Sequence, residues 1–170
     1  MNITGPPPKF YGTRDILLAR RQGTQASGDA PHSIRRLGTE GVCIRIITYR
    51  IFIPWFHEVA VGQTVRWLDN HGVPYWDLCL MRDKGPVDAD VYVDDGPENI
   101  ERLRSARKMV IVFDNSTNRH LPDEPGGRAH SWQEAEGMIR ERYYSFLDEH
   151  QCAHPSEPGR RPPWDKSTAV

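Results

Sequence analysis

Residues 91–113 read VYVDDGPENIERLRSARKMVIVF, and their pattern is the clearest indication of the fold. The run Val91–Asp94 is short and apolar until its last residue, which predicts a strand. Pro97 favours the first turn of a helix with apolar side chains at helical spacing. The run Met109–Phe113 is apolar at every position, as expected of a strand covered on both faces. A strand, a helix and a strand in this order predict parallel pairing with a right-handed crossover.

The same alternation continues on both sides of this stretch. Apolar and β-branched runs predict strands, and apolar side chains at helical spacing predict helices. We expect a helix over residues 33–40, a strand over 42–48, a helix over 56–70, a strand over 76–81 and a last helix opened by the capping box Ser131-Trp132-Gln133-Glu134. The sequence therefore predicts an α/β, Rossmann-like domain with a mainly parallel sheet between two helical layers.

The two ends of the chain differ in composition from this core. Residues 1–31 are rich in Pro, Gly, Ser, Thr and Arg, and Ile16–Ala19 is their one apolar patch. Residues 150–170 again lack periodicity, which is typical of a disordered tail. We expect an irregular or disordered segment over 1–31, one ordered domain over 32–149 and a disordered tail over 150–170.

Composition excludes several classes of function. The chain has 170 residues, a net charge of −1 and a pI near 6.7, without the basic excess of a nonspecific nucleic-acid binder. No apolar run has the length of a membrane span, and residues 1–8 lack a signal-peptide pattern. The three cysteines form no CxxC pair, which favours reduced thiols. We expect a cytoplasmic protein that contacts neither nucleic acid nor membrane.

Two adjacent carboxylates, Asp94 and Asp95, stand at the end of the strand predicted to begin at Val91. Two neighbouring acids repel each other unless a cation joins them, and Mg²⁺ prefers oxygen ligands. In the alternative interpretation Asp95 only caps the helix that follows. The pair by itself leaves both interpretations open.

Other polar side chains follow the remaining strands, and in a parallel sheet these strand ends meet at one edge. A hydroxyl, cations and a carboxylate pair are what a phosphoryl group and its metal require. The candidates for phosphate are Thr48, Tyr49, Arg82 and Lys84, the candidates for Mg²⁺ are Asp94 and Asp95, and a polar loop follows at residues 115–119. Singly, Thr48 can cap a turn and Lys84 can be solvated, but the ordered set predicts a phosphate site.

This set resembles the haloacid dehalogenase (HAD) superfamily of phosphohydrolases. Motif II is matched by Ile46-Ile47-Thr48, motif III by Lys84 and motif IV by the run 91–95. The amino-acid sequence from Met81-Arg82-Asp83-Lys84 onward, with Asn118-Arg119 and Ser131-Trp132, is similar to that of the 5'(3')-deoxyribonucleotidase branch. The resemblance covers about residues 33–140.

The resemblance implies a fold, an activity and roles for individual residues. It implies a HAD-like three-layer sandwich and Mg²⁺-dependent hydrolysis of a phosphate monoester, with a small phosphorylated molecule such as a nucleotide as the partner. Asp94 would ligate Mg²⁺, Asp95 would support it, Thr48 would bind phosphate, and Lys84 would steady the nucleophile and the phosphate. Trp55, Phe56 and Trp76 are candidates either for a base-stacking pocket or for the core.

One family motif is missing. The family nucleophile is the first Asp of an Asp-x-Asp that ends a central strand, and residues 1–47 contain no Asp-x-Asp. Asp15 precedes its apolar patch, and Asp88-x-Asp90 lies before the motif IV strand rather than after a strand. We therefore expect a sheet without the usual central strand, and no cap. A truncated or frame-shifted chain, direct pairing of the flanking strands, or a strand from another subunit would each explain the gap, and we favour the first.

Two functions remain open at this point. The chain is either a phosphohydrolase-family protein resembling 5'-nucleotidases that is inactive or truncated as written, or a non-catalytic HAD-like binding or structural module. An unpaired sheet edge would also allow a homo-oligomer.

Overall fold

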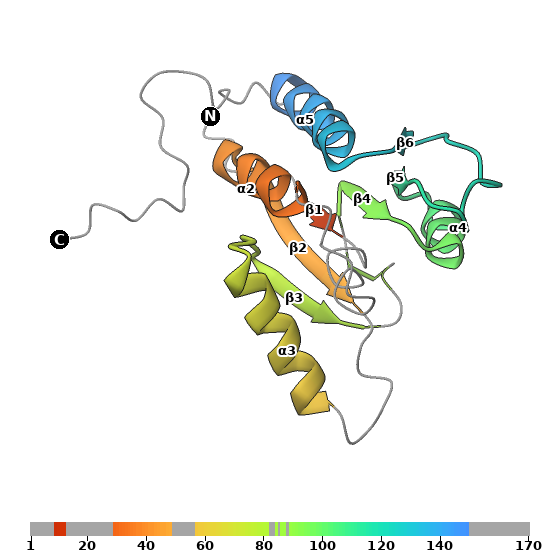
Figure 1. Ribbon diagram of the computed structural model, residues 1–170. Coiled ribbons are helices and arrows are strands. Elements are labelled where there is room, and N and C mark those ends of the chain that lie inside the picture. The colour runs from red at the N-terminus through yellow and green to blue at the C-terminus, as the bar shows by residue number, and fades with distance from the viewer. Residues whose placement is uncertain are drawn as a thin grey trace.

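The computed structural model describes residues 29–48, 57–81, 84, 86–87 and 89–149, together with the backbone of residues 9–12. The tail predicted over residues 150–170 lies outside the described residues, as does most of the segment 1–31. Among the described residues the chain forms an α/β fold with helices on both faces of a parallel sheet, as predicted (Figure 1).

Six parallel strands form the described sheet, in the order β3-β2-β1-β4-β5-β6. Their bounds are β1 Lys9–Gly12, β2 Cys43–Thr48, β3 Asp77–Leu80, β4 Val91–Asp94, β5 Val110–Phe113 and β6 Arg128–Ala129. The four described helices are α2 Ala30–Glu40, α3 His57–Asn70, α4 Pro97–Ser105 and α5 Trp132–Glu149. Each predicted helix and strand is present, with ends that differ by up to three residues.

The expectation that the sheet lacks its central strand is wrong. Strand β1 lies between β2 and β4, with Lys9 paired to Cys43 and Phe10 paired to Val91 (Figure 1). Its four residues, KFYG, are too few and too mixed to show a strand pattern in the sequence. A central strand bonds to two neighbours, and that tertiary pairing compensates for weak local propensity. The backbone edges of β2 and β4 are therefore paired, without a strand from another subunit.

Two further differences concern the start of helix α2 and an additional short strand, β6. Helix α2 begins at Ala30 rather than at Ser33, because Pro31 is accommodated in the first turn, where no amide donor is needed. Strand β6 was not predicted, because two residues are too short for any periodicity. The predicted capping box is confirmed in its first half, since Ser131 Oγ accepts from the Glu134 amide. Its second half differs: Glu134 Oε2 accepts from the His130 amide, one residue before the cap.

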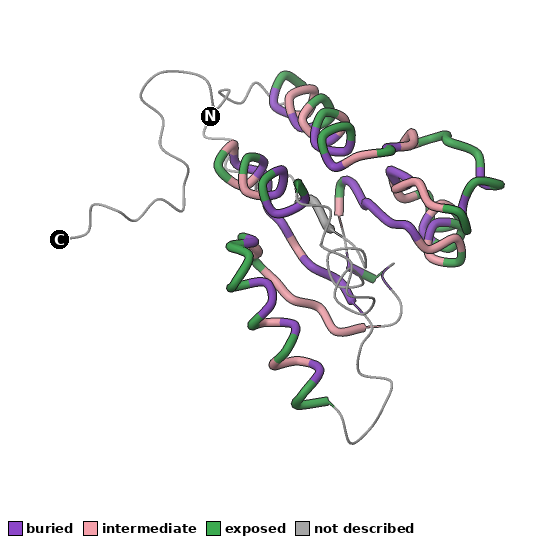
Figure 2. Tube along the Cα trace, in the orientation of Figure 1, coloured by how far each residue is buried: buried purple, intermediate pink, exposed green. Residues whose placement is uncertain are grey.

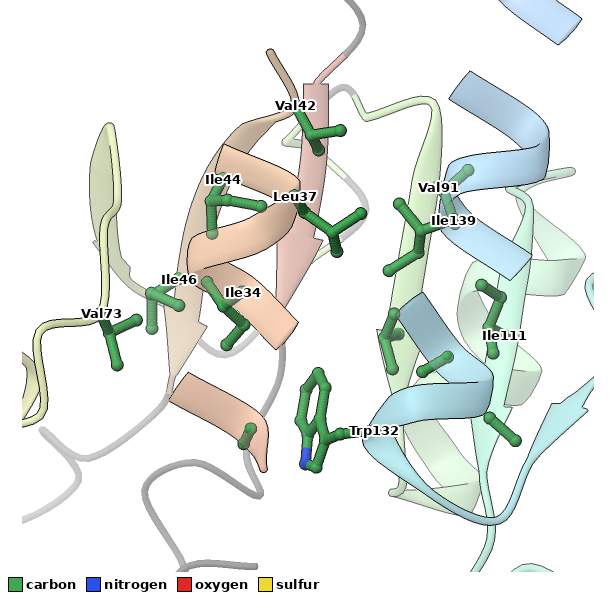
Figure 3. Packing of buried hydrophobic residues seen from close by; sticks show 14 of the residues in the cluster. Ile34, Leu37, Val42, Ile44, Ile46, Val73, Val91, Ile111, Trp132 and Ile139 are labelled. Carbon is green, nitrogen blue, oxygen red and sulfur yellow. The ribbon is translucent and has the colours of Figure 1, made fainter. Parts of the chain in front are cut away.

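Strand β4 separates two hydrophobic clusters, one on each face of the sheet. Its odd-numbered residues Val91 and Val93 pack with α2 and α5, whereas Tyr92 packs with α4 on the opposite face. Figure 2 shows β4 buried along its whole length, in contrast to the half-buried edge strand β3. Figure 3 shows the first cluster, in which Trp132 and Ile139 of α5 approach the sheet. Burial on both faces explains why the strand carries no alternating polar pattern.

Helices α2 and α5 are joined by charged side chains as well as by the core. Glu136 is 3% exposed and accepts hydrogen bonds from Arg36 and from Arg140, and Arg140 also binds Glu40. These hydrogen bonds, Arg36's above all, lower the pKa of Glu136 from 4.5 to about 2 against the opposing effect of burial. The buried carboxylate is therefore charged in the folded protein and fixes the two helices against each other.

Candidate functional site

The order in which the chain adds strands to the sheet reverses between β1 and β4. A site is expected at this junction. Along the chain, β1, β2 and β3 extend the sheet to one side, and β4, β5 and β6 extend it to the other. In open α/β sheets a crevice forms at such a switch, beyond the carboxyl ends of the strands. Asp94 is the last residue of β4 and therefore stands at this junction.

Lys84 and Asp94 form a buried ion pair at this position. Lys84 Nζ lies 2.5 Å from Asp94 Oδ2, and the two side chains are 7% and 0% exposed. Asp94 Oδ1 accepts from the Gly96 amide at 2.9 Å and from Asn99 Nδ2 at 3.4 Å. A buried carboxylate needs such compensation, since burial without a partner disfavours charge strongly. The structure thus brings together the residues assigned to motifs III and IV.

Asp95 is held by its backbone rather than by its carboxylate. Its carbonyl oxygen accepts from Asn115 Nδ2 and from Asn118 Nδ2, each at 3.0 Å. Asp95 is 7% exposed, and within the described part of the chain its Oδ1 is buried without a hydrogen-bond partner. A buried carboxylate oxygen without a donor is costly, which makes it a candidate ligand for a cation.

The alternative interpretation, in which Asp95 caps the next helix, does not hold. The N-cap of α4 is Gly96, and no side chain caps that helix. The nearest carboxylate interaction is made by Asp94, whose Oδ1 accepts from the Gly96 amide across a turn. The two acids therefore differ in role, since Asp94 is paired and Asp95 has a free oxygen.

Thr48 ends β2 at the same edge of the sheet, with β1 between it and β4. It is 2% exposed, and its carbonyl accepts from the Met81 amide, which fixes the start of the segment leading to Lys84. Two strand spacings correspond to about 10 Å, so Thr48 flanks the crevice rather than touching the acidic pair. Tyr49 and Arg82, also predicted to bind phosphate, lie outside the described residues.

The segment that carries Lys84 is also tied to β4 at a second point. The Tyr92 hydroxyl donates to the Val87 carbonyl, and the Val87 amide donates to the Lys84 carbonyl. Tyr92 and Asp94 are two positions apart, so both lie on one face of the strand. Strand β4 thus holds Lys84 both directly and through this turn. The sequence did not reveal the contact, because Tyr92 reads as one more strand aromatic.

Comparison with known proteins bears on this arrangement. The family described as 5' nucleotidase, deoxy (pyrimidine), cytosolic type C protein matches residues 22–144. This chain belongs to that family. A Chlorobaculum tepidum protein provisionally named 5'(3')-deoxyribonucleotidase is 52% identical over 137 residues, which cover 79% of this chain and 66% of that protein. The HAD-like resemblance and its 5'-nucleotidase branch are confirmed. The chain spans just under two thirds of the relative's length.

The extent of the family match separates two parts of the site. Thr48, Lys84, Asp94 and Asp95 all fall inside residues 22–144, whereas β1 precedes the match. The residues that follow β1 are Thr13-Arg14-Asp15, where the resemblance calls for Asp-x-Asp. The four candidate residues therefore lie within the part of the chain that matches the family, and the departure from the family pattern lies at the central strand, outside that match.

The acidic pair fits a divalent cation in part. Mg²⁺ often takes one or two carboxylates and keeps several waters, and the unpaired Oδ1 of Asp95 beside Asp94 supplies such oxygens. Among the described residues no three His, Cys, Asp or Glu side chains gather as a metal site. Asp94 and Asp95 would therefore be the described ligands, and a bound cation would polarise phosphate oxygens there.

One of the aromatic candidates lies away from the acidic pair. Trp76, an open candidate for base stacking, precedes β3 at the opposite edge of the sheet and is 61% exposed. It lines an apolar hollow of about 720 Å³ together with Val73 and Tyr75. Trp76 is therefore neither core nor part of the acidic site, and Trp55 and Phe56 lie outside the described residues.

No helix in the described ranges combines the length and apolarity that crossing a membrane requires.

Proposed function

We propose that this chain is a 5'-nucleotidase-family domain that binds Mg²⁺ and a nucleoside monophosphate without hydrolysing the ester by the family's covalent route. Asp94 and Asp95 hold the cation, and Lys84 and Thr48 meet the phosphate. The deoxyribonucleotide class rests on the name of the Chlorobaculum tepidum relative, and a cytoplasmic location rests on the family's description.

The observation that carries the proposal is the contrast between β1 and β4. Strand β4 ends at the buried Asp94, which is paired with Lys84, and the buried Asp95 follows it. Strand β1 occupies the central position, yet Gly12 ends it and Thr13 and Arg14 follow. The family's covalent route needs an attacking carboxylate directly after this strand, and in the sequence Asp15 is the first carboxylate, three positions after Gly12. Binding groups are retained where the attacking group is absent.

Lys84 supports phosphate binding through its charge. It is an ammonium on a buried stem, paired with Asp94 at the switch point. A cation at Asp94 and Asp95 would compete for the same carboxylate and leave the ammonium available to a phosphate oxygen. Mg²⁺ and phosphate monoester should therefore bind cooperatively, each raising the affinity for the other.

Calorimetric titration with Mg²⁺, with and without a deoxyribonucleoside 5'-monophosphate, tests this proposal. We expect Mg²⁺ binding that weakens at least about 10-fold in Asp95→Asn, because a charged ligand oxygen is lost. Lys84→Met should keep Mg²⁺ binding and lose the cooperativity with nucleotide. If Asp95→Asn binds Mg²⁺ as tightly as the parent chain, the site is not at the acidic pair.

A further inference from the structure

Asn118 is completely buried, and each polar atom of its side chain is used twice. Its Nδ2 donates to the Asp95 carbonyl at 3.0 Å and to the Phe113 carbonyl at 2.8 Å. Its Oδ1 accepts from the Asn115 amide at 3.1 Å and from Arg128 Nη1 at 2.9 Å. A buried amide with all four positions satisfied specifies one geometry.

The two carbonyls that Asn118 binds are the ends of neighbouring strands. Asp95 follows the last residue of β4, and Phe113 is the last residue of β5. Beyond these residues the ladder between the two strands stops, since Asp94 pairs with Val112. The amide of Asn118 continues the connection where the ladder ends, and so fixes the backbone of Asp95.

Arg128 holds Asn118 from the other side. Besides Asn118 Oδ1, its guanidinium donates to Asp114 Oδ1 at 2.8 Å and to the Leu121 carbonyl at 2.8 Å. The side chain of Arg128 is 10% exposed, and its hydrogen bond to Asp123 raises its pKa. Arg128, Asn118 and Asp95 thus form a continuous chain of hydrogen bonds that leads from β6 to the acidic pair.

From this arrangement we propose that Asn118 is the positioning residue of the acidic pair, with Arg128 supporting it. We propose further that the hydrogen bonds from Arg128 through Asn118 to Asp95 set the affinity for the divalent cation. The inference rests on the proposed function, because the cation site is part of that proposal. All four hydrogen-bonding positions of the Asn118 amide are used within the protein, so its proposed role is to position Asp95 and not to bind the cation. The amide holds the Asp95 carbonyl, and with it the backbone of the residue whose buried Oδ1 has no hydrogen-bond partner in the described part of the chain.

The test compares Mg²⁺ affinity with stability in matched variants. Asn118→Ser replaces the amide by a shorter hydroxyl and removes its hydrogen bonds to the two carbonyls. Arg140→Gln removes a comparably bonded arginine from the α2–α5 contact, outside the hydrogen bonds that reach Asp95. We expect Asn118→Ser to weaken Mg²⁺ binding about 10-fold to 100-fold, as loss of a group that orients a ligand does. Arg140→Gln should leave Mg²⁺ affinity unchanged at a similar loss of thermal stability.

A second variant keeps the test decisive if Asn118→Ser does not fold. Asn115→Ser removes one hydrogen bond to the Asp95 carbonyl from a half-buried residue, and should weaken Mg²⁺ binding by a smaller factor in the same direction. Equal Mg²⁺ affinities in the parent chain, in Asn118→Ser and in Arg140→Gln would overturn the positioning role and leave the proposed function standing. A parent chain that binds no Mg²⁺ would overturn both.

Discussion

Lys84 Nζ and Asp94 Oδ2 lie 2.5 Å apart, with both side chains almost completely removed from solvent. The pair joins the segment after β3 to the end of β4, beside the point where the strand order of the sheet reverses. Buried pairs of this kind add little net stability when complete, yet they become costly once one partner is removed. The stability of the contact between the segment after β3 and the end of β4 therefore depends on keeping the charges of Lys84 and Asp94 paired.

Lys84→Met tests that balance directly. The variant keeps an apolar stem but leaves Asp94 charged and buried, so we expect a loss of about 3–5 kcal/mol in the free energy of unfolding. Lys84→Met combined with Asp94→Asn removes both charges and should recover a large part of that loss. Urea denaturation of the three proteins measures this, and equal stability of the single and double variants would refute the charge argument.

The two acids should respond in opposite ways to neutralisation in cation-free buffer. Asp94→Asn leaves Lys84 unpaired, and we expect a loss of about 3–5 kcal/mol. Asp95→Asn removes the charge from a carboxylate whose buried Oδ1 has no donor, so stability should be unchanged or rise by about 1 kcal/mol. Denaturation midpoints in EDTA provide the measurement. A larger loss in Asp95→Asn than in Asp94→Asn would contradict the assigned contacts.

Acid should weaken the contact between α2 and α5. The pKa of Glu136 falls from 4.5 in the unfolded chain to about 2 in the folded protein, chiefly through the Arg36 hydrogen bond. A depressed pKa gives stability that is complete above about pH 4.5 and disappears as the pH falls towards 2. Glu136→Gln should lose about 2 kcal/mol at pH 7 and flatten the stability profile in that pH range.

The matched control for Glu136→Gln is Glu141→Gln, which neutralises an exposed carboxylate on the same helix. It should leave both the stability at pH 7 and the shape of the acid profile close to those of the parent chain. Thermal unfolding followed from pH 2 to pH 7 gives both quantities. A parent-like acid profile in Glu136→Gln would show that the buried carboxylate does not control this contact.

Two glycines separate close packing from helix propensity. A Cβ on Gly126 would overlap the backbone carbonyl of Val110 at the start of β5, whereas a Cβ on Gly137 of α5 meets no atom within 4 Å. Gly126→Ala should therefore destabilise by more than about 2 kcal/mol, as overpacking against backbone does. Gly137→Ala should stabilise by about 0.5–1 kcal/mol through helix propensity. Circular dichroism melts of the two variants measure both effects.

Much of this arrangement was predictable from sequence, and the exceptions have identifiable causes. The apolar run 109–113 and the acidic end of 91–95 marked buried strands and their site, because burial and charge are visible in residue type. Strand β1 could not be predicted, since a four-residue strand in the middle of a sheet owes its form to its neighbours. The role of Asn118 depended on which carbonyls its amide reaches, and a sequence records the polar loop without those partners.

We propose above that this chain keeps the binding half of a 5'-nucleotidase site and lacks the attacking carboxylate. The most direct measurement is phosphate release from a deoxyribonucleoside 5'-monophosphate by the purified chain with Mg²⁺, beside Asp94→Asn and Asp15→Asn. Asp15 is included because it is the first carboxylate after β1 in the sequence. We expect the same background release from all three proteins, while Mg²⁺ binds the parent chain. Mg²⁺-dependent release by the parent chain that disappears in Asp94→Asn or in Asp15→Asn would contradict it.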